Sequence, residues 1–146
     1  MKKNLVSVIL PVFNGEFYIN QAINSILQQS HHHLELIIIN DGSTDNTAQI
    51  ISTISDNRIK TFHQKNSGPS NARNRGLKEA TGNYISLIDA DDIYLPNKLA
   101  EQISFLDQTE ADACYCDHQL IDENSQKGGI IKSEGIYQNS QDFLAM

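Results

Sequence analysis

Hydrophobic residues follow two alternating patterns along the chain. Short, almost continuous apolar runs are typical of buried strands, whereas apolar residues that recur every three or four positions are typical of amphipathic helices. The apolar runs predict strands at Leu5 to Phe13, Leu34 to Ile39, Arg58 to His63, Tyr84 to Ile88 and Ala111 to Cys116. The helical patterns lie between these strands, over about residues 17–29 and 44–55, from Pro69 to the stop at Gly82, and from Pro96 onward.

This alternation predicts an α/β fold, Rossmann-like, with a mostly parallel central sheet and helices on both faces. The 146 residues, 39% of them hydrophobic, suit a single domain that spans residues 1–146. Sheets of this kind bind ligands beyond the carboxyl ends of their strands. We therefore expect three polar segments that follow strands to converge on one crevice: Pro11-Val12-Phe13-Asn14, Asn40-Asp41-Gly42-Ser43 and Asp89-Ala90-Asp91-Asp92.

The strand at Tyr84 to Ile88 is followed by three acidic residues within four positions, Asp89, Asp91 and Asp92. Carboxylates this close repel one another, and a hard divalent cation such as Mg²⁺ or Mn²⁺ relieves the repulsion by binding their oxygens. A solvated acidic turn ahead of a helix has the same sequence signature, since Asp is common in turns. These residues alone leave both interpretations open.

The formal net charge of −7, from 11 basic and 18 acidic residues, argues against a nucleic-acid backbone or an anionic membrane surface as the main partner. No apolar run approaches the roughly 20 residues that span a bilayer, and no signal-peptide pattern follows Met1. We therefore expect a cytoplasmic protein without a transmembrane segment. Peripheral attachment to the inner face of the plasma membrane stays open.

Two groups of residues are of types that commonly bind metals, but the sequence favours a different explanation for each group. Cys114 and Cys116 alternate within the last predicted strand, which predicts two packed side chains on one face rather than a zinc site or a disulfide. His31, His32 and His33 are expected at a helix end and in the loop that follows it, with metal binding as the less favoured alternative.

Four segments match, in order, the motifs of one enzyme family: Val6 to Gly15, Asn40 to Asp45, Asn66 to Asn74 and Asp89 to Asp92. Together they resemble the N-terminal, donor-binding half of a family 2 glycosyltransferase of the GT-A fold. The resemblance implies a bacterial, inverting enzyme that moves a sugar from a nucleoside diphosphate sugar, usually a UDP sugar, to an acceptor hydroxyl. Polysaccharide or cell-envelope glycan synthesis is the expected setting.

The resemblance also implies which residues bind the donor nucleotide. They are Pro11, Phe13, Asn14, Glu16, Asp41, Arg73, Asp89 and Ala90. Phe13 matches the position of an aromatic residue beside the base, and an ordinary core Phe at a strand end is the alternative. Asp41 matches the acid that accepts a hydrogen bond from the base edge, and a simple Asp-Gly turn is the alternative.

At the diphosphate, the resemblance implies that Asp89 reaches the ribose and that Asp91 or Asp92 holds a divalent ion, Mg²⁺ or Mn²⁺, within the family's DXD metal motif. The sequence leaves open which of the two acids is the direct ligand. Arg73 is expected to pair with a phosphate or a base carbonyl, or with Asp91 or Asp92 when the site is empty.

The chain departs from the family where a general base is needed. In relatives the base comes from a second half that begins beyond about residue 140, and Asp117, Asp122 and Glu123 lie too early to replace it. Ser140 looks like the cap of a helix that has hardly begun, so we expect a donor-binding half truncated near 135–146. The isolated chain is therefore expected to be inactive in sugar transfer.

Two other functions stay as alternatives. A nucleotide-sugar-binding module without turnover would differ from the enzyme only in lacking the base. A Mg²⁺-dependent phosphotransfer domain would place its key acid after the first strand, where this chain has Pro11-Val12-Phe13-Asn14. A dinucleotide-dependent dehydrogenase is excluded, because the Gly-x-Gly-x-x-Gly turn is missing after that strand.

Overall fold

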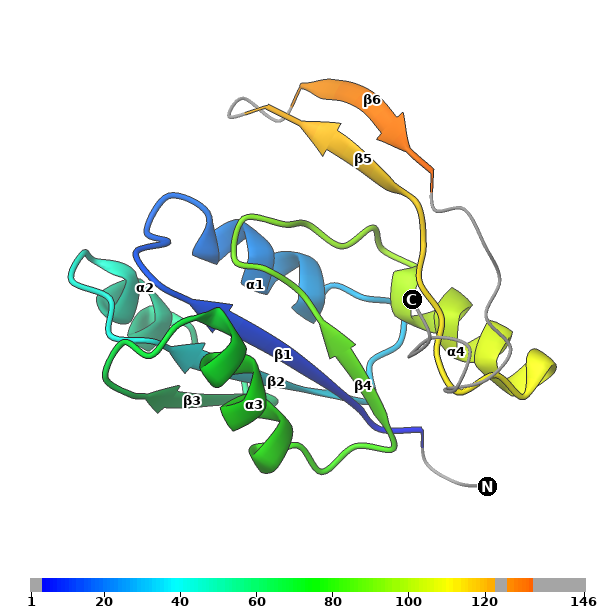
Figure 1. The fold of residues 1–146 in the computed structure, drawn as a ribbon, viewed down its shortest axis with the longest axis horizontal. Coiled ribbons are helices and arrows are strands. Elements are labelled where there is room, and N and C mark those ends of the chain that lie inside the picture. Colours follow the sequence, from blue (N-terminus) through cyan, green and yellow to red (C-terminus); the bar gives the residue numbers. More distant parts are fainter. Residues whose placement is uncertain (1–3, 123–125, 133–146) are drawn as a thin grey trace. The chain divides into compact units, whose positions relative to one another are not determined.

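A parallel sheet of four strands in the order β3-β2-β1-β4 forms the centre of the computed structural model, which describes residues 4–122 and 126–132 (Figure 1). The strands are β1 (Val6–Val12), β2 (Leu34–Asn40), β3 (Ile59–His63) and β4 (Tyr84–Leu87). The helices that connect them are α1 (Ile19–Leu27), α2 (Thr47–Thr53) and α3 (Pro69–Glu79). These elements belong to the first of two compact units, Met1–Lys98.

The strand order places helices on both faces of the sheet. The chain moves outward from β1 through β2 to β3, and then returns past β1 to form β4 on its other side. Since such crossovers are right-handed, α1 and α2 cover one face and α3 covers the other (Figure 1). The order therefore reverses between β1 and β4, and the carboxyl ends of these two strands flank a crevice.

The two central strands supply most of the core. Every residue of β1 and of β2 is buried, as their continuous apolar runs predicted. On the α3 side, Ala72 and Gly76 are buried, and a Cβ atom at Gly76 would overlap the side chain of Ile9. Small residues one turn apart thus let α3 pack closely against β1. The neighbouring Leu77 is 46% exposed, because Ala72 and Gly76 fix which side of α3 meets the sheet.

β4 differs from the buried strand that its apolar run predicted. Ile85 is 45% and Leu87 is 50% exposed, and no described strand pairs with β4 on the side away from β1. Within the described residues β4 is therefore an edge strand. Its register with β1 is nevertheless regular, with Ile9 opposite Leu87, so the acidic residues that follow lie at the same edge as the end of β1.

The second unit, Leu99–Met146, contains most of α4 (Lys98–Thr109) and an antiparallel pair, β5 (His118–Ile121) and β6 (Lys127–Ile131). The strand predicted at Ala111 to Cys116 is wrong. Residues 111–116 pair with no described strand, whereas His118–Ile121 pairs with β6, and hydrogen bonds between Asp122 and Gln126 extend that pair. Cys116 is consequently exposed. Glu123 and the helix start expected at Ser140 lie outside the described residues.

No helix in the described part of the chain combines the length and the apolar character that crossing a membrane requires.

A buried carboxylate ties the sheet together at the end opposite the crevice. Glu35 of β2 accepts hydrogen bonds from Ser7 Oγ (2.5 Å), Lys60 Nζ (2.7 Å) and the backbone N–H of Thr81 (2.7 Å). Burial by itself would raise the pKa of Glu35, but these donors outweigh burial and lower the pKa to about 2. The ionised carboxylate therefore stabilises the contacts among β1, β2, β3 and the loop before β4.

We expect Glu35→Gln to lower the free energy of unfolding at neutral pH by on the order of 2 kcal/mol, after allowing for solvent screening. A depressed pKa gives stability that is present above the unfolded value of 4.5 and is lost as the pH falls toward about 2. The variant should therefore lose less stability than the unaltered chain as the pH falls over that range. Part of the acid sensitivity should remain, because Arg58 also lowers the pKa of Asp56 to about 2. Urea unfolding at several pH values measures this. Glu101→Gln, which alters an exposed acid of α4, should leave the pH profile unchanged.

Candidate functional site

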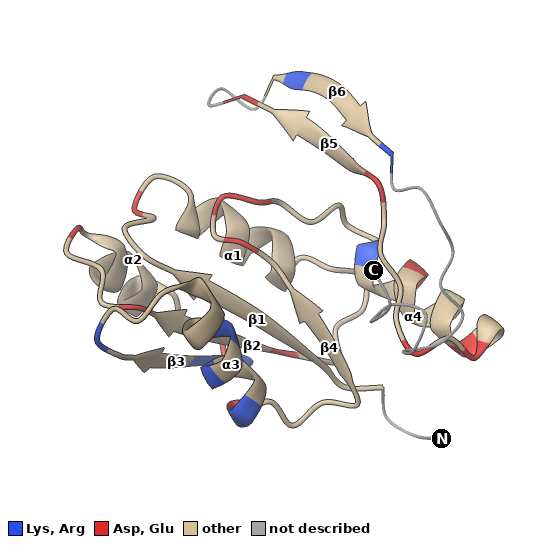
Figure 2. Cartoon of the chain, viewed as in Figure 1, with Lys and Arg blue, Asp and Glu red and all other residues tan. Residues whose placement is uncertain are grey.

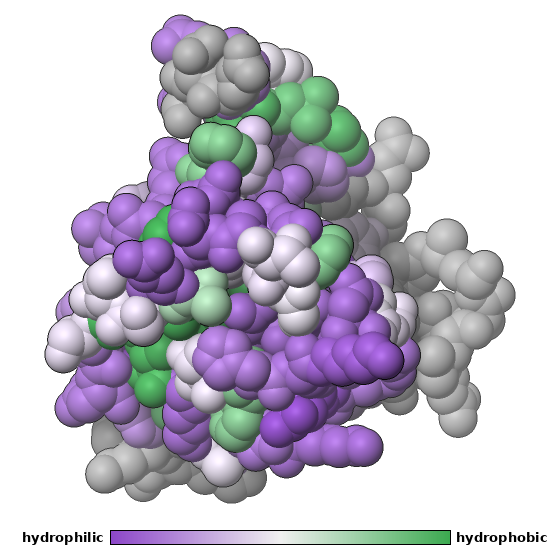
Figure 3. All heavy atoms as spheres, turned by 90° about the vertical axis from the view of Figure 1, so that its left-hand side faces the viewer, coloured by the Kyte–Doolittle hydropathy of each residue, from purple (hydrophilic) through white to green (hydrophobic). Residues whose placement is uncertain are grey.

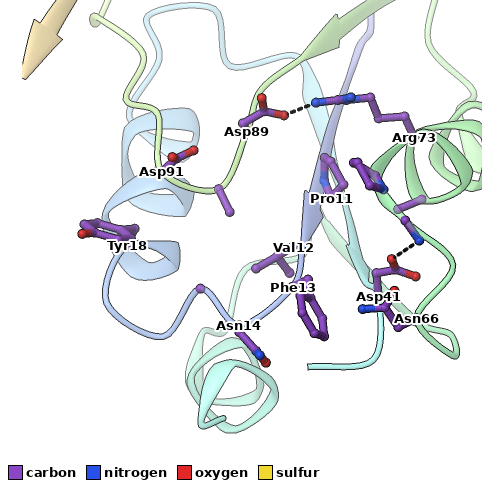
Figure 4. Close-up of a pocket in the computed structure, with 15 residues that line it drawn as sticks. Pro11, Val12, Phe13, Asn14, Tyr18, Asp41, Asn66, Arg73, Asp89 and Asp91 are labelled. Atoms are coloured by element: carbon purple, nitrogen blue, oxygen red, sulfur yellow. Dashed lines mark hydrogen bonds and ion pairs between the residues drawn. The ribbon is translucent and has the colours of Figure 1, made fainter. Parts of the chain in front are cut away.

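A cavity of about 610 Å³ opens at the carboxyl ends of β1, β2 and β4 (Figure 4). Its lining combines backbone and side chains from four segments: Pro11, Val12, Phe13, Asn14, Gly15, Tyr18, Asp41, Asn66, Gly68, Pro69, Ala72, Arg73, Asp89, Ala90 and Asp91. The three polar segments expected to converge do so in this cavity. Of the predicted site residues, only Glu16 and Asp92 are not among those that line it.

Asp41, directly after β2, is 3% exposed, and its carboxylate organises the loop before α3. Its Oδ1 accepts hydrogen bonds from Gln64 Nε2 (2.8 Å) and Ser67 N (3.0 Å), and its Oδ2 accepts one from Gly68 N (2.9 Å). The carboxylate thus joins the end of β2 to the start of α3. The chain bends at the next residue, Gly42, which adopts φ 76°, where a side chain would be strained.

Asn14, which lines the cavity, and Glu16, which does not, both form hydrogen bonds within the protein. Asn14 Oδ1 accepts a hydrogen bond from Thr44 N (2.8 Å), and Glu16 Oε2 accepts bonds from the backbone (3.0 Å) and side-chain (2.9 Å) nitrogens of Asn46. In return, Asp45 Oδ2 accepts a bond from Glu16 N (3.1 Å). This reciprocal set holds the loop after β1 to the loop after β2. It also explains why α2 begins at Thr47, later than its apolar pattern predicted.

Arg73, in the second turn of α3, points across the cavity to Asp89 and forms an ion pair of 2.5 Å (Figure 4). The sequence predicted Asp91 or Asp92 as its partner in an empty site, and that expectation is wrong. Asp89 is the first residue of the acidic segment that extends past the buried Ile88, so it lies nearest to α3. One cation and one carboxylate are thereby held at one end of the cavity.

Asp91 lines the cavity and Asp92 does not. Within the described chain, no three His, Cys, Asp or Glu side chains are gathered closely enough to form a ready metal cluster. The donor set nevertheless fits a hard cation, because Mg²⁺ commonly takes one or two carboxylates from the protein and its other ligands from water and phosphate. Asp91, an exposed acid of the lining, meets that requirement, whereas Asp89 is paired with Arg73.

The segment after the acids is fixed to β4 and to the residues that follow α1. Tyr94, buried to 7% exposure, bonds through its hydroxyl to Ser86 Oγ (2.7 Å) and to the carbonyl of Leu87 (2.8 Å). The buried amide of Gln29 donates to the carbonyl of Leu95 (2.7 Å). The acidic residues are therefore an exposed segment between two anchored points, Ile88 and Tyr94.

Sequence reasoning missed two lining side chains, Tyr18 and Asn66. Tyr18 precedes α1 and lies on the Asp91 side of the cavity, whereas Asn66 lies beside Asp41 (Figure 4). Asn66 belongs to one of the matched family motifs, and that motif could have pointed to its role in the lining. Tyr18 has no such motif and is marked only by its place before a helix. Phe13 is 50% exposed, which rules out the core interpretation of that residue.

The end of the molecule toward which the strands point is mostly hydrophilic, with small apolar areas between polar side chains (Figure 3). Such a surface, with one cavity that combines an aromatic ring and charged groups, is typical of a site for a polar ligand with an apolar part.

The fold and the cavity define an open α/β protein with a ligand site where the strand order reverses. The chain belongs to a known family: the sequence model of "Glycosyl transferase family 2" matches residues 7–143. The family and the GT-A fold expected from the motifs are thus confirmed.

A named relative and two solved structures are informative. The chain is 36% identical over 140 residues to the Escherichia coli UDP-Glc:alpha-D-GlcNAc-diphosphoundecaprenol beta-1,3-glucosyltransferase WfgD, covering 95% of this chain and 55% of WfgD. Staphylococcus aureus TarS, solved with UDP-GlcNAc, matches with a TM-score of 0.68 and 34% identity over 73% of this chain and 32% of that one. The mannosyltransferase PcManGT from Pyrobaculum calidifontis, solved with GDP-Man and Mn²⁺, matches with a TM-score of 0.65 and 27% identity over 69% of this chain and 32% of that one.

The chain spans between 18% and 55% of the length of the curated relatives that it matches.

We expect Asp41→Ala to destabilise the protein by about 1–3 kcal/mol, because the backbone N–H groups of Ser67 and Gly68 and the side chain of Gln64 would lose a shared, buried acceptor. Hydrogen exchange should show faster exchange at these two amides than in the unaltered chain. Asp91→Asn, which changes an exposed acid of the same cavity, should leave their exchange unchanged. Equal protection in Asp41→Ala would contradict the role of Asp41 in holding this loop.

Proposed function

We propose that the cavity binds the nucleoside diphosphate of a sugar donor, with a UDP sugar as the expected donor, and that the whole protein transfers the sugar to an acceptor hydroxyl with inversion. The observation that carries this proposal is the composition of one cavity. An exposed aromatic ring and a buried carboxylate lie at one end, and an Arg–Asp pair with a further acid lies at the other (Figure 4).

The end with Phe13, Asp41 and Asn66 fits the base. The half-exposed ring of Phe13 offers a stacking surface. Uracil presents one N–H donor between two carbonyl acceptors, and the amide of Asn66 supplies both an acceptor and a donor for that edge. Asp41 already accepts hydrogen bonds from three protein donors, which leaves little acceptor capacity for a base. We therefore assign base reading to Asn66 together with Asp41, rather than to Asp41 alone.

The end with Arg73, Asp89 and Asp91 fits the ribose and the diphosphate. Arg73 can exchange its ion pair with Asp89 for a phosphate oxygen, which frees the Asp89 carboxylate for a ribose hydroxyl. Asp91 would hold a divalent cation, Mg²⁺ or Mn²⁺, and this ion would supply neutralising charge to the diphosphate. The Mn²⁺ in the PcManGT structure supports such a cation.

In the proposed reaction the acceptor oxygen attacks the anomeric carbon as the bond from that carbon to the diphosphate breaks, which inverts the configuration. The proton of the acceptor hydroxyl passes to a carboxylate base. Because the chain spans only 55% of WfgD, transfer is proposed for the whole protein and not for this chain alone. The lipid-linked acceptor in the name of WfgD supports a place in cell-envelope glycan synthesis, in the cytoplasm.

The phosphotransfer alternative is disfavoured by the lining of the cavity. The segment after β1, where that class needs its acid, contributes Pro11, Val12, Phe13 and Asn14. A nucleotide-sugar-binding module without turnover would use the same cavity, so the binding experiments below serve both functions and a transfer assay with the whole protein separates them.

In calorimetric titrations with Mn²⁺ present, we expect the chain to bind UDP more tightly than ADP or GDP. Asn66→Ala should narrow this preference, because it removes the amide that matches the uracil edge. Ser70→Ala, an exposed neighbour outside the cavity lining, is the matched control and should keep the preference. Equal affinity for all three nucleotides would contradict the assignment of the base end.

We expect Mn²⁺ to raise the melting temperature by several degrees more with UDP than without it, since ligands that bind only the folded state stabilise it. Asp91→Asn should remove most of this coupling while leaving the melting temperature without ligand nearly unchanged, because the side chain is exposed. Asp92→Asn should retain the coupling. The reverse result would assign the metal to Asp92, and unchanged coupling in both variants would support the solvated-turn interpretation.

A further inference from the structure

Positive charge is concentrated in one stretch of this acidic chain. The 21 residues from Arg58 to Lys78 contain six of the 11 basic residues and no acidic residue, so the rest of the chain carries five basic and all 18 acidic residues. The stretch forms β3, α3 and the loop between them, where the Lys and Arg positions gather in Figure 2. A local concentration of this kind creates a positive field on a protein whose net charge is negative.

Three of the six cations form ion pairs of 2.8 Å or less. Arg58 pairs with Asp56 (2.8 Å), Lys60 pairs with Glu35 (2.7 Å) and Arg73 pairs with Asp89 (2.5 Å). The structural and site roles described above therefore account for these three. They do not account for Lys65, Arg75 and Lys78.

The remaining three cations line one groove, which we call the α3 groove. It has a volume of about 760 Å³ and is lined by Gln64, Lys65, Ser67, Asn71, Asn74, Arg75, Leu77 and Lys78. Neither Lys65 nor Lys78 has an ion-pair partner among the described residues, and both are exposed. Arg75 stacks over the ring of Phe62 and forms a longer ion pair, 3.7 Å, with Glu79 of the same helix.

The spacing of these cations fits a surface rather than a single anion. Lys65 precedes α3 and Lys78 lies in its last turn, and the 11 residues of the helix extend over roughly 16 Å. One phosphate group cannot contact donors that far apart, whereas an array of phosphates can. Leu77, 46% exposed between Arg75 and Lys78, adds an apolar group that would be stabilised by entering a lipid interface.

We propose that the α3 groove docks on a membrane surface that contains anionic phospholipids. A nucleic acid is also an extended array of phosphates, but no aromatic side chain is among the groove-lining residues to stack on bases. The proposal goes beyond nucleotide binding and does not depend on it. Its consequence for the proposed enzyme is positional, because the loop before α3 contributes Ser67 to the groove and Asn66 and Gly68 to the cavity.

The expected attachment is reversible and sensitive to salt. Each basic residue at an anionic bilayer contributes roughly a fivefold gain in partitioning, so three contribute roughly a hundredfold. Screening at high ionic strength should remove most of this gain.

The test is co-sedimentation of the chain with vesicles of phosphatidylcholine, with and without phosphatidylglycerol. We expect binding only to vesicles with phosphatidylglycerol, and loss of that binding at high salt. The double variant Lys65→Gln/Lys78→Gln should bind roughly 25-fold more weakly. The control Lys127→Gln/Lys132→Gln removes the same charge from exposed positions of the second unit and should bind as the unaltered chain does.

Two further experiments distinguish an anionic membrane from other negatively charged ligands. Inorganic phosphate should displace the chain from vesicles no better than chloride at equal ionic strength, and stronger displacement would indicate a single-phosphate site and overturn the proposal. Binding to a duplex oligonucleotide without binding to anionic vesicles would overturn it as well. So would equal vesicle binding by the unaltered chain and the Lys65→Gln/Lys78→Gln variant, or loss of binding in the control.

Calorimetry with UDP distinguishes this proposal from the proposed function. Both double variants should retain the nucleotide affinity of the unaltered chain, which also shows that they fold. A chain that binds UDP but no vesicles refutes membrane docking alone, whereas a chain that binds vesicles but no nucleotide refutes only the donor site.

Discussion

The buried carboxylate of Asp41 is the contact on which the candidate site depends. It accepts hydrogen bonds from backbone N–H groups of Ser67 and Gly68, and so fixes the loop before α3 against the end of β2. This loop carries Asn66 and leads into the helix that carries Arg73. Because the Asp41 carboxylate is buried and bridges several donors, losing it would cost more than an ordinary surface hydrogen bond. One carboxylate therefore positions groups at both ends of the cavity.

A second set of contacts gives the site its opposite wall. The loop after β1 and the loop after β2 hold each other through reciprocal bonds of Asn14, Glu16 and Asp45. Asn14 and Glu16, which the family resemblance assigns to the nucleotide, thus help to fix the shape of this wall. The acidic segment is held differently, between the buried Ile88 and Tyr94, which leaves Asp89 and Asp91 exposed to meet a ligand. Fixed walls with a few exposed charged groups are what orientation of a flexible diphosphate requires.

Charge is divided between two neighbouring surfaces of the same unit. The cavity pairs its cation with an acid, whereas the α3 groove leaves Lys65 and Lys78 without such partners among the described residues. The loop between β3 and α3 lies between the two surfaces and contributes to both. If the proposed docking holds, the cavity lies close to the bilayer.

The sequence by itself determined the alternation of elements, the buried character of β1 and β2, and the three polar segments that meet in the cavity, because these follow from local periodicity and from the rule for parallel sheets. The tertiary structure decided the contacts between distant residues. It gave Asp41 its partners at Ser67 and Gly68, paired Arg73 with Asp89, turned Phe13 toward solvent and placed a strand at His118–Ile121 instead of Ala111 to Cys116. Local pattern shows which residues can form a strand or accept a hydrogen bond. Which partner each one meets depends on where the chain brings the other segments, and that information is not contained in any short stretch of sequence.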